Sequence, residues 1–279
     1  MHPSKPFLRI SAAVIVISVI IFIAACHKSK APGPEDTTYA TEHVIAEQSF
    51  NDAQNISDDA ASLPSGGSLA YRTTATTSNP CATVTHNGNT ITVDFGTKDC
   101  ICNDGRKRRG QIIITYTGAH YSDSGSVHTL TFNNFYQNDN KITGTKTTTN
   151  MGLNKLGQPY FNVSINGAVT MNGGGTISTS WTRVRTWTAG YSTLTYQPDD
   201  VYQVTGSGKM TCANGSVVNI NITDTLVVAN SCHWIEAGSV TYTLSNGNTR
   251  TLDYGDTPAC DDQATITLGN GTVKTITLP

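Results

Sequence analysis

The chain has 279 residues, which is enough for one large β domain or two small domains. Its formal net charge is −2 and only 14% of its residues are charged, so its overall electrostatics do not indicate a nucleic-acid partner. Threonine, asparagine, glycine and serine replace charged residues along much of the chain, which is common in extracytoplasmic β proteins.

The N-terminus has the pattern of an export signal. Lys5 and Arg9 precede an apolar run that ends at Cys26. The run has the length of a signal-peptide core and is short for a helix that spans a bilayer. We therefore expect residues 1–25 to be a signal peptide. An uncleaved N-terminal anchor is the alternative.

Residues 23–26, with the sequence Ile-Ala-Ala-Cys, resemble the lipobox of bacterial lipoproteins. The resemblance implies cleavage by signal peptidase II before Cys26. It also implies a diacylglyceryl group on the Cys26 thiol and a further acyl chain, such as palmitate, on its amine. Two or three acyl chains hold a protein firmly at a membrane, whereas one chain binds only marginally.

Residues 26–39 contain prolines and mixed charges without an apolar period, so they are expected to form a flexible tether. Residues 40–64 are expected to form a helix that packs on a sheet, and a partner-binding helix is the alternative. Its acidic residues lie largely off one apolar stripe. The stripe consists of Ala46, Phe50, Ala53, Ile56, Ala60 and Leu63.

Residues 69–279 alternate between apolar and polar side chains with the period of a β-strand. Asn-Gly and Gly-Asn pairs punctuate the alternation and favour tight hairpin turns. We therefore predict a mainly β fold with one N-terminal α-helix. Its strands form a long antiparallel meander, arranged as a sandwich or as a partly closed barrel. A division into two related hairpin-rich halves, residues 81–165 and 181–279, is left open.

Two segments of the β domain resemble each other. Residues 89–96 lie between cysteines 81 and 102, and residues 248–255 lie between cysteines 232 and 260. Both segments end in an Asp-aromatic-Gly sequence before a cysteine. A decayed duplication and independent convergence of threonine-rich strands both account for the likeness.

Six cysteines remain once Cys26 carries lipid, and an even number in an exported chain predicts disulfides. The internal resemblance favours Cys232 with Cys260, and Cys81 with Cys100 or Cys102. Cys212 is then left for the remaining member of the Cys100–Cys102 pair. A zinc site is the competing interpretation, but no histidine has ligand spacing beside these two cysteines, so no metal is expected.

The same segments carry a family resemblance. Residues 94–96, 102–110, 143–147, 199–202, 252–255 and 260–261 together are similar to a lipoprotein family of Bacteroidota, over residues 40–279. The resemblance implies a lipid-anchored location and a β fold, and it brings no activity. We expect the protein in the bacterial cell envelope, at the outer membrane, with the leaflet left open.

Two clusters of side chains are candidate binding sites. The first, Arg106, Lys107, Arg108 and Arg109, is a candidate for binding phosphate or carboxylate groups. Cations at a strand edge that deter aggregation are the alternative.

The second cluster alternates along one predicted strand and consists of Trp181, Arg183, Arg185 and Trp187. These side chains share one face of the strand. An aromatic platform for sugar rings is the functional interpretation, and a cation–π ladder is the structural one.

The remaining polar motifs do not indicate an enzyme. Asp199-Asp200 and Asp261-Asp262 are adjacent pairs, and neighbouring residues of a strand point to opposite faces. No nucleophile elbow and no zinc-protease helix motif occurs. We predict a non-catalytic, lipid-anchored envelope protein with a binding or scaffolding role and no cofactor. The expected partners are the membrane and an envelope glycan or protein. A glycan-binding accessory lipoprotein is the alternative, and an envelope hydrolase ranks third.

Overall fold

The computed structural model describes residues 37–63, 68–69, 81–193 and 196–279. The predicted signal peptide, Cys26 and most of the predicted tether lie outside the described residues. Within the described part of the chain, no helix is both long enough and apolar enough to cross a bilayer.

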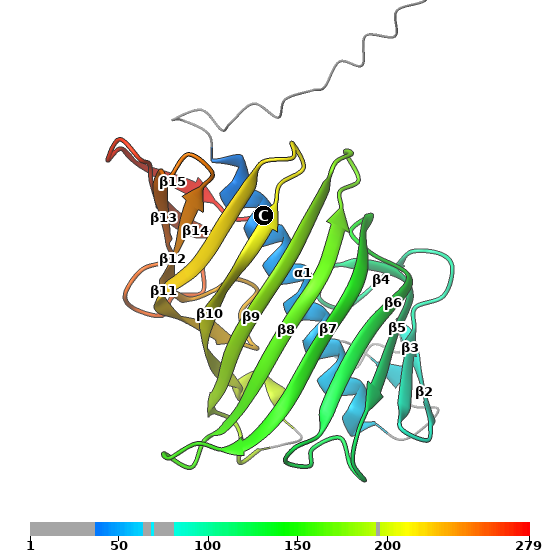
Figure 1. The fold of residues 1–279 in the computed structure, drawn as a ribbon. Helices are drawn as coiled ribbons and strands as arrows, with labels where there is room; N and C mark the ends of the chain where they lie inside the picture. The colour runs from blue at the N-terminus through cyan, green and yellow to red at the C-terminus, as the bar shows by residue number, and fades with distance from the viewer. Residues whose placement is uncertain (1–36, 64–67, 70–80, 194–195) are drawn as a thin grey trace, which may run out of the picture.

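The predicted N-terminal helix is present. Helix α1, Thr38–Ser62, has 25 residues. It lies against one face of a long antiparallel sheet whose two ends curl back around it (Figure 1). The predicted mainly β fold with a single N-terminal helix is therefore confirmed.

The strands form one meander. Each main strand pairs with its neighbour along the chain, in the order β1-β2-β3-β5 and then β6 through β15, and β4 pairs with β5. The sheet does not close on itself, so it corresponds to the partly closed barrel among the predicted arrangements. The strands are β1 Ser68–Leu69, β2 Ala82–Asn87, β3 Thr90–Asp94, β4 Cys100–Ile101, β5 Lys107–Tyr116, β6 Val127–Gln137, β7 Asn140–Leu153, β8 Pro159–Thr170, β9 Thr176–Ala189, β10 Val201–Thr211, β11 Val217–Ala229, β12 Ala237–Leu244, β13 Thr249–Asp253, β14 Gln263–Thr267 and β15 Val273–Thr277.

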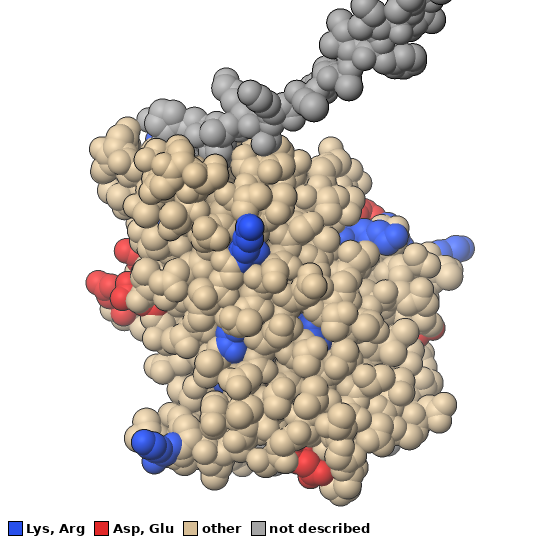
Figure 2. Space-filling model, in the orientation of Figure 1, with Lys and Arg blue, Asp and Glu red and all other residues tan. Residues whose placement is uncertain are grey.

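The two faces of the sheet differ in the way that the alternation predicts. In β9, every second residue from Ile177 to Arg183 is buried, and the residues between them are exposed. The face of the molecule shown in Figure 2 carries few charged side chains. The buried face packs against α1 and forms one hydrophobic core with it.

The helix is more completely buried than its apolar stripe predicts. Phe50 and Ile56 of the stripe are fully buried, and the acidic residues Glu42, Glu47 and Asp52 are also buried, at 4–8% exposed. A flat sheet would cover one side of the helix only, whereas this sheet curls around it. The polar side of α1 therefore also faces the sheet and requires polar partners there.

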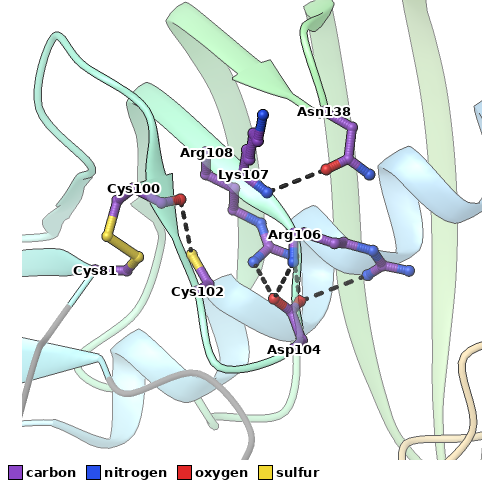
Figure 3. The surroundings of a disulfide bond; sticks show 8 residues. All are labelled: Cys81, Cys100, Cys102, Asp104, Arg106, Lys107, Arg108 and Asn138. Atoms are coloured by element: carbon purple, nitrogen blue, oxygen red, sulfur yellow. Dashed lines mark hydrogen bonds and ion pairs between the residues drawn. A yellow bond between two sulfur atoms is a disulfide. The ribbon is translucent and has the colours of Figure 1, made fainter.

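Two of the predicted disulfides are present. Cys81 is bonded to Cys100, and Cys232 is bonded to Cys260. Each bond joins the open ends of a hairpin, β2–β3 in one case and β12–β13 in the other. Figure 3 shows the first of these bonds beside the turn that follows β4.

The third predicted disulfide is wrong. Cys102 and Cys212 are both buried, and neither forms a disulfide. Cys102 precedes β5 and Cys212 follows β10, and four strands of the sheet separate β5 from β10. At about 4.8 Å between neighbouring strands, that separation is too large for a disulfide.

Replacement of Gly167 tests the packing of the helix against the sheet. A Cβ atom at Gly167 of β8 would lie 2.4 Å from Phe50 Cζ and 2.7 Å from the Thr143 carbonyl oxygen. We expect Gly167→Ala to lower the free energy of unfolding by about 1–3 kcal/mol, because the helix must shift. Gly173→Ala is the control, since a Cβ there meets nothing within 4 Å. Equal urea midpoints for the two variants would contradict this packing.

Candidate functional site

Charged side chains meet inside the sheet around Glu47. The Glu47 carboxylate lies 3.5 Å from Arg183 Nη2 of β9 and 3.5 Å from His43 Nε2, one helical turn earlier. Burial opposes ionisation of Glu47, but the Arg183 charge and the His43 hydrogen bond outweigh it and lower its pKa to about 2. His43 Nδ1 also shares a 2.9 Å hydrogen bond with the Tyr242 hydroxyl of β12. Glu47 is therefore an ionised anchor between α1 and β9.

A second charged group lies further along the helix. Lys146 Nζ of β7 donates a 3.0 Å hydrogen bond to the carbonyl oxygen of Phe50. Burial, together with the nearby Arg185 charge, lowers the pKa of Lys146 to about 7. Arg185 Nη1 lies 3.5 Å from Asp58 Oδ2, and its guanidinium lies 3.3 Å from the centre of the Tyr202 ring.

Arg108 of the predicted anion-binding cluster is fully buried. Its Nη1 and Nη2 donate to both carboxylate oxygens of Asp104, at 2.9 and 2.6 Å. Its Nε donates to Gln137 Oε1 at 3.0 Å. Figure 3 shows Arg108 and Arg106 turned toward Asp104, with the Lys107 side chain pointing away. Arg108 is thus a structural cation.

The other two arginines of the cluster are also paired. Arg106 forms an ion pair with Asp52 of α1 and contacts the His233 ring. Arg109 donates to Asp139 Oδ1 at 2.6 Å, is paired with Asp99 and lies over the Tyr136 ring.

The ion pairs of this cluster argue against the predicted anion-binding role of Arg106, Lys107, Arg108 and Arg109 as a whole. Three of the four side chains are neutralised by carboxylates. Only Lys107 remains an exposed cation without a described carboxylate partner.

The burial of Trp181 and Arg183 argues against the predicted sugar platform. Trp181, Arg183, Arg185 and Trp187 share one strand face as expected, but it is the inner face. Trp181 is 1% exposed and Arg183 is 5% exposed, so a glycan at the surface cannot reach them. The cation–π interpretation holds for Arg183, whose guanidinium lies 5.0 Å from the centre of the Trp181 ring. Trp187 stacks on Tyr202 at 5.6 Å instead.

The adjacent carboxylate pairs do not form acid–base machinery. Asp200 is buried and accepts hydrogen bonds from Trp187 Nε1 at 3.2 Å and from Asn230 Nδ2 at 3.2 Å. Burial raises the pKa of Asp200 to about 6. Its neighbour Asp199 is exposed and accepts a hydrogen bond from Thr193. Asp261 and Asp262 are bonded within their own turn.

One cavity lies between α1 and two loops of the sheet. It has a volume of about 360 Å³ and is bounded by three segments that are far apart in the sequence. The first is the middle of α1, including Gln48, Asn51 and Asn55. The second is the turn 104–106 after β4, and the third is the loop 231–235 between β11 and β12. We call this cavity the seam cleft.

Side chains bridge the mouth of the seam cleft. Arg106 reaches from the β4–β5 turn to Asp52 below it and to His233 opposite it. Two polar groups of the lining residues, Trp234 Nε1 and the Tyr254 hydroxyl, have no hydrogen-bond partner within the described chain. Sequence reasoning did not identify this site, since its residues form no local motif.

One cluster of described residues has metal-ligand spacing. It consists of Cys232, Glu236 and Cys260, whose ligand atoms lie within 4.8 Å of one another. The two sulfur atoms form a disulfide, so they are not thiolates that can coordinate a metal.

Comparisons of the chain with protein-family models, with curated proteins and with solved structures find no match. The functional interpretation accordingly rests on the residues and their arrangement.

Replacement of Asp104 tests whether the basic cluster is structural. Asp104→Ala leaves the buried Arg108 guanidinium without its carboxylate, so we expect a loss of about 3–5 kcal/mol in the free energy of unfolding. Asp99→Ala removes a carboxylate from the partly exposed Arg109 and should cost less than about 1 kcal/mol. Denaturant titration measures both. Similar small losses would mean that Arg108 does not depend on Asp104.

Proposed function

We propose that this is a non-catalytic, lipid-anchored protein of the bacterial cell envelope that binds a ligand in the seam cleft. The observation that carries the proposal is the cleft itself. Its volume of about 360 Å³ falls in the range of small-molecule sites. The lipobox ending at Cys26 and the two disulfides support an exported location.

The polar groups beside the cleft support binding over catalysis. Arg106 forms an ion pair with Asp52 and contacts His233. Asp104 forms an ion pair with Arg108. A general base or a nucleophile needs a free reactive group beside the substrate. Here the charged groups are used to position the walls of the cleft.

A glycan is the second candidate, and it is favoured by the lining of the cleft. Gln48, Asn51 and Asn55 present carboxamides, which donate and accept hydrogen bonds as sugar hydroxyls require. Trp234 and Tyr254 add aromatic rings with a polar atom on each. The glycan proposal therefore moves from Trp181, which is buried inside the sheet, and the partly buried Trp187 to the seam cleft.

Cys26 tests the membrane anchor. We expect the mature protein from its native host to carry acyl chains on Cys26 and to enter the detergent phase on Triton X-114 partitioning. Cys26→Ala should remain in the aqueous phase or keep residues 1–25, as mass spectrometry would show. Cys212→Ala is the matched cysteine control, and this variant should still be acylated on Cys26. An unacylated Cys26 in the wild-type protein would rule out the anchor.

Trp234 tests the cleft. We expect immobilised envelope polysaccharides or a glycan array to retain the purified protein, and Trp234→Ala to weaken binding at least tenfold. Tyr196→Ala removes an exposed aromatic side chain elsewhere and should bind as wild type does. Thermal melts of both variants check that they fold. If Trp234→Ala leaves glycan binding unchanged, the ligand binds outside the cleft.

A further inference from the structure

A second, much smaller cavity lies between α1 and the middle of the sheet. It has a volume of about 30 Å³ and is lined by Lys146 of β7, by Arg183 and Arg185 of β9 and by Glu47 of α1. Asn51, Gln54 and Asn55 of α1 add carboxamides to its wall. By the space that one buried water requires, this volume admits one or two water-sized groups.

The charges around this cavity do not balance. Arg183 is paired with Glu47 and Arg185 is paired with Asp58, each at 3.5 Å. Lys146 forms no ion pair with a described carboxylate and donates instead to the Phe50 carbonyl. Three basic side chains thus face two carboxylates, and one positive charge is left over whenever Lys146 is protonated. An uncompensated charge in a protein interior is costly, so this arrangement favours a bound negative charge.

A second observation points to the same kind of ligand. Arg183 is 5% exposed, and its Nε–H has no hydrogen-bond partner within the described chain. Its Nη2 lies at 3.5 Å from Glu47, the outer limit of a hydrogen bond. A buried guanidinium with an unused donor, beside an unpaired ammonium group, needs an acceptor that the chain does not provide.

We propose that this interior cavity binds one monovalent anion of chloride size, held by Lys146 and Arg183. The small volume excludes phosphate, sulfate and the larger organic anions. The carboxamides of α1 supply further N–H donors from the helix side. A single negative charge neutralises the excess cation and gives the Arg183 Nε–H an acceptor. The anion then acts as a structural link between α1, β7 and β9.

Proton linkage follows from the same geometry. The cationic form of Lys146 attracts the anion, and burial lowers the pKa of Lys146 to about 7 in the empty cavity. Arg183, Arg185, Glu47 and Asp58 are the other charged groups that act on it. Binding of the anion should therefore be tighter at pH 6 than at pH 8, because Lys146 must take up a proton at the higher pH.

The experiment measures thermal unfolding of the mature protein in detergent at pH 6.5 and constant ionic strength, while sodium chloride replaces sodium gluconate. We expect Tm to rise by about 3–5 °C when chloride exceeds its Kd about tenfold, and to keep rising with the logarithm of the chloride concentration above that point. Lys146→Met should remove the chloride-dependent rise. Lys209→Met, at an exposed position of the neighbouring strand β10, should retain it.

Crystals of the wild-type protein grown in bromide provide a second readout that does not depend on a variant folding. Anomalous diffraction should show a bromide ion beside Lys146 and Arg183. No chloride effect on Tm and no bromide peak would mean that the cavity holds water, which overturns the proposal. A bromide peak without any effect of chloride on wild-type Tm would indicate an adventitious ion only, and it also overturns the proposal. Neither result bears on glycan binding in the seam cleft.

Discussion

The enclosure of a polar helix by a curled sheet is the constraint on which the other features of this structure depend. Helix α1 cannot bury its acidic residues against an apolar sheet, because unpaired carboxylates in an interior are too costly. The inner face of the sheet and the turn before β5 consequently carry the matching cations. Arg183 forms an ion pair with Glu47, Arg106 with Asp52, and Arg185 with Asp58. These pairs contribute little net stability relative to apolar packing, but breaking one is expensive. Their value is that they define the rotation and the axial position of the helix inside the sheet.

The same pairing explains why the two most conspicuous sequence clusters are not binding sites. Four consecutive basic residues on a loop would normally be solvated, and arginines that alternate with tryptophans on a strand suggest an exposed platform. In this fold the loop folds over α1 and the strand face points inward. Carboxylates of the helix and of the β4–β5 turn form ion pairs with these cations. The surface shown in Figure 2, by contrast, carries few charges and is built from the outward side of the strands.

Local patterns in the sequence predicted most of the architecture. Alternation located the strands, Asn-Gly pairs located several turns, and the 3.6-residue period located α1. The internal resemblance led to Cys232–Cys260 and restricted the partner of Cys81 to two residues. The curl of the sheet was not predictable, because no local pattern states how far a meander bends. The partner of Arg183 is Glu47, 136 residues away, and no period connects them. The third disulfide failed because an even cysteine count says nothing about how many strands separate two thiols.

The seam cleft follows from the same curl, since it lies between α1 and two loops of the sheet. A disulfide holds the segment that forms each wall of the cleft. Cys81–Cys100 holds the hairpin that leads into the 104–106 turn, and Cys232–Cys260 holds the loop on the opposite side. Arg106 of the 104–106 turn then contacts His233 of the opposite loop and forms an ion pair with Asp52 of α1. Loops that are held in this way lose little conformational freedom when a ligand binds, which is the main route by which a rigid scaffold gains affinity. An unclosed sheet would otherwise leave two free edges and a partly uncovered helix. Under the proposed function, the two disulfides also help the cleft to keep its shape.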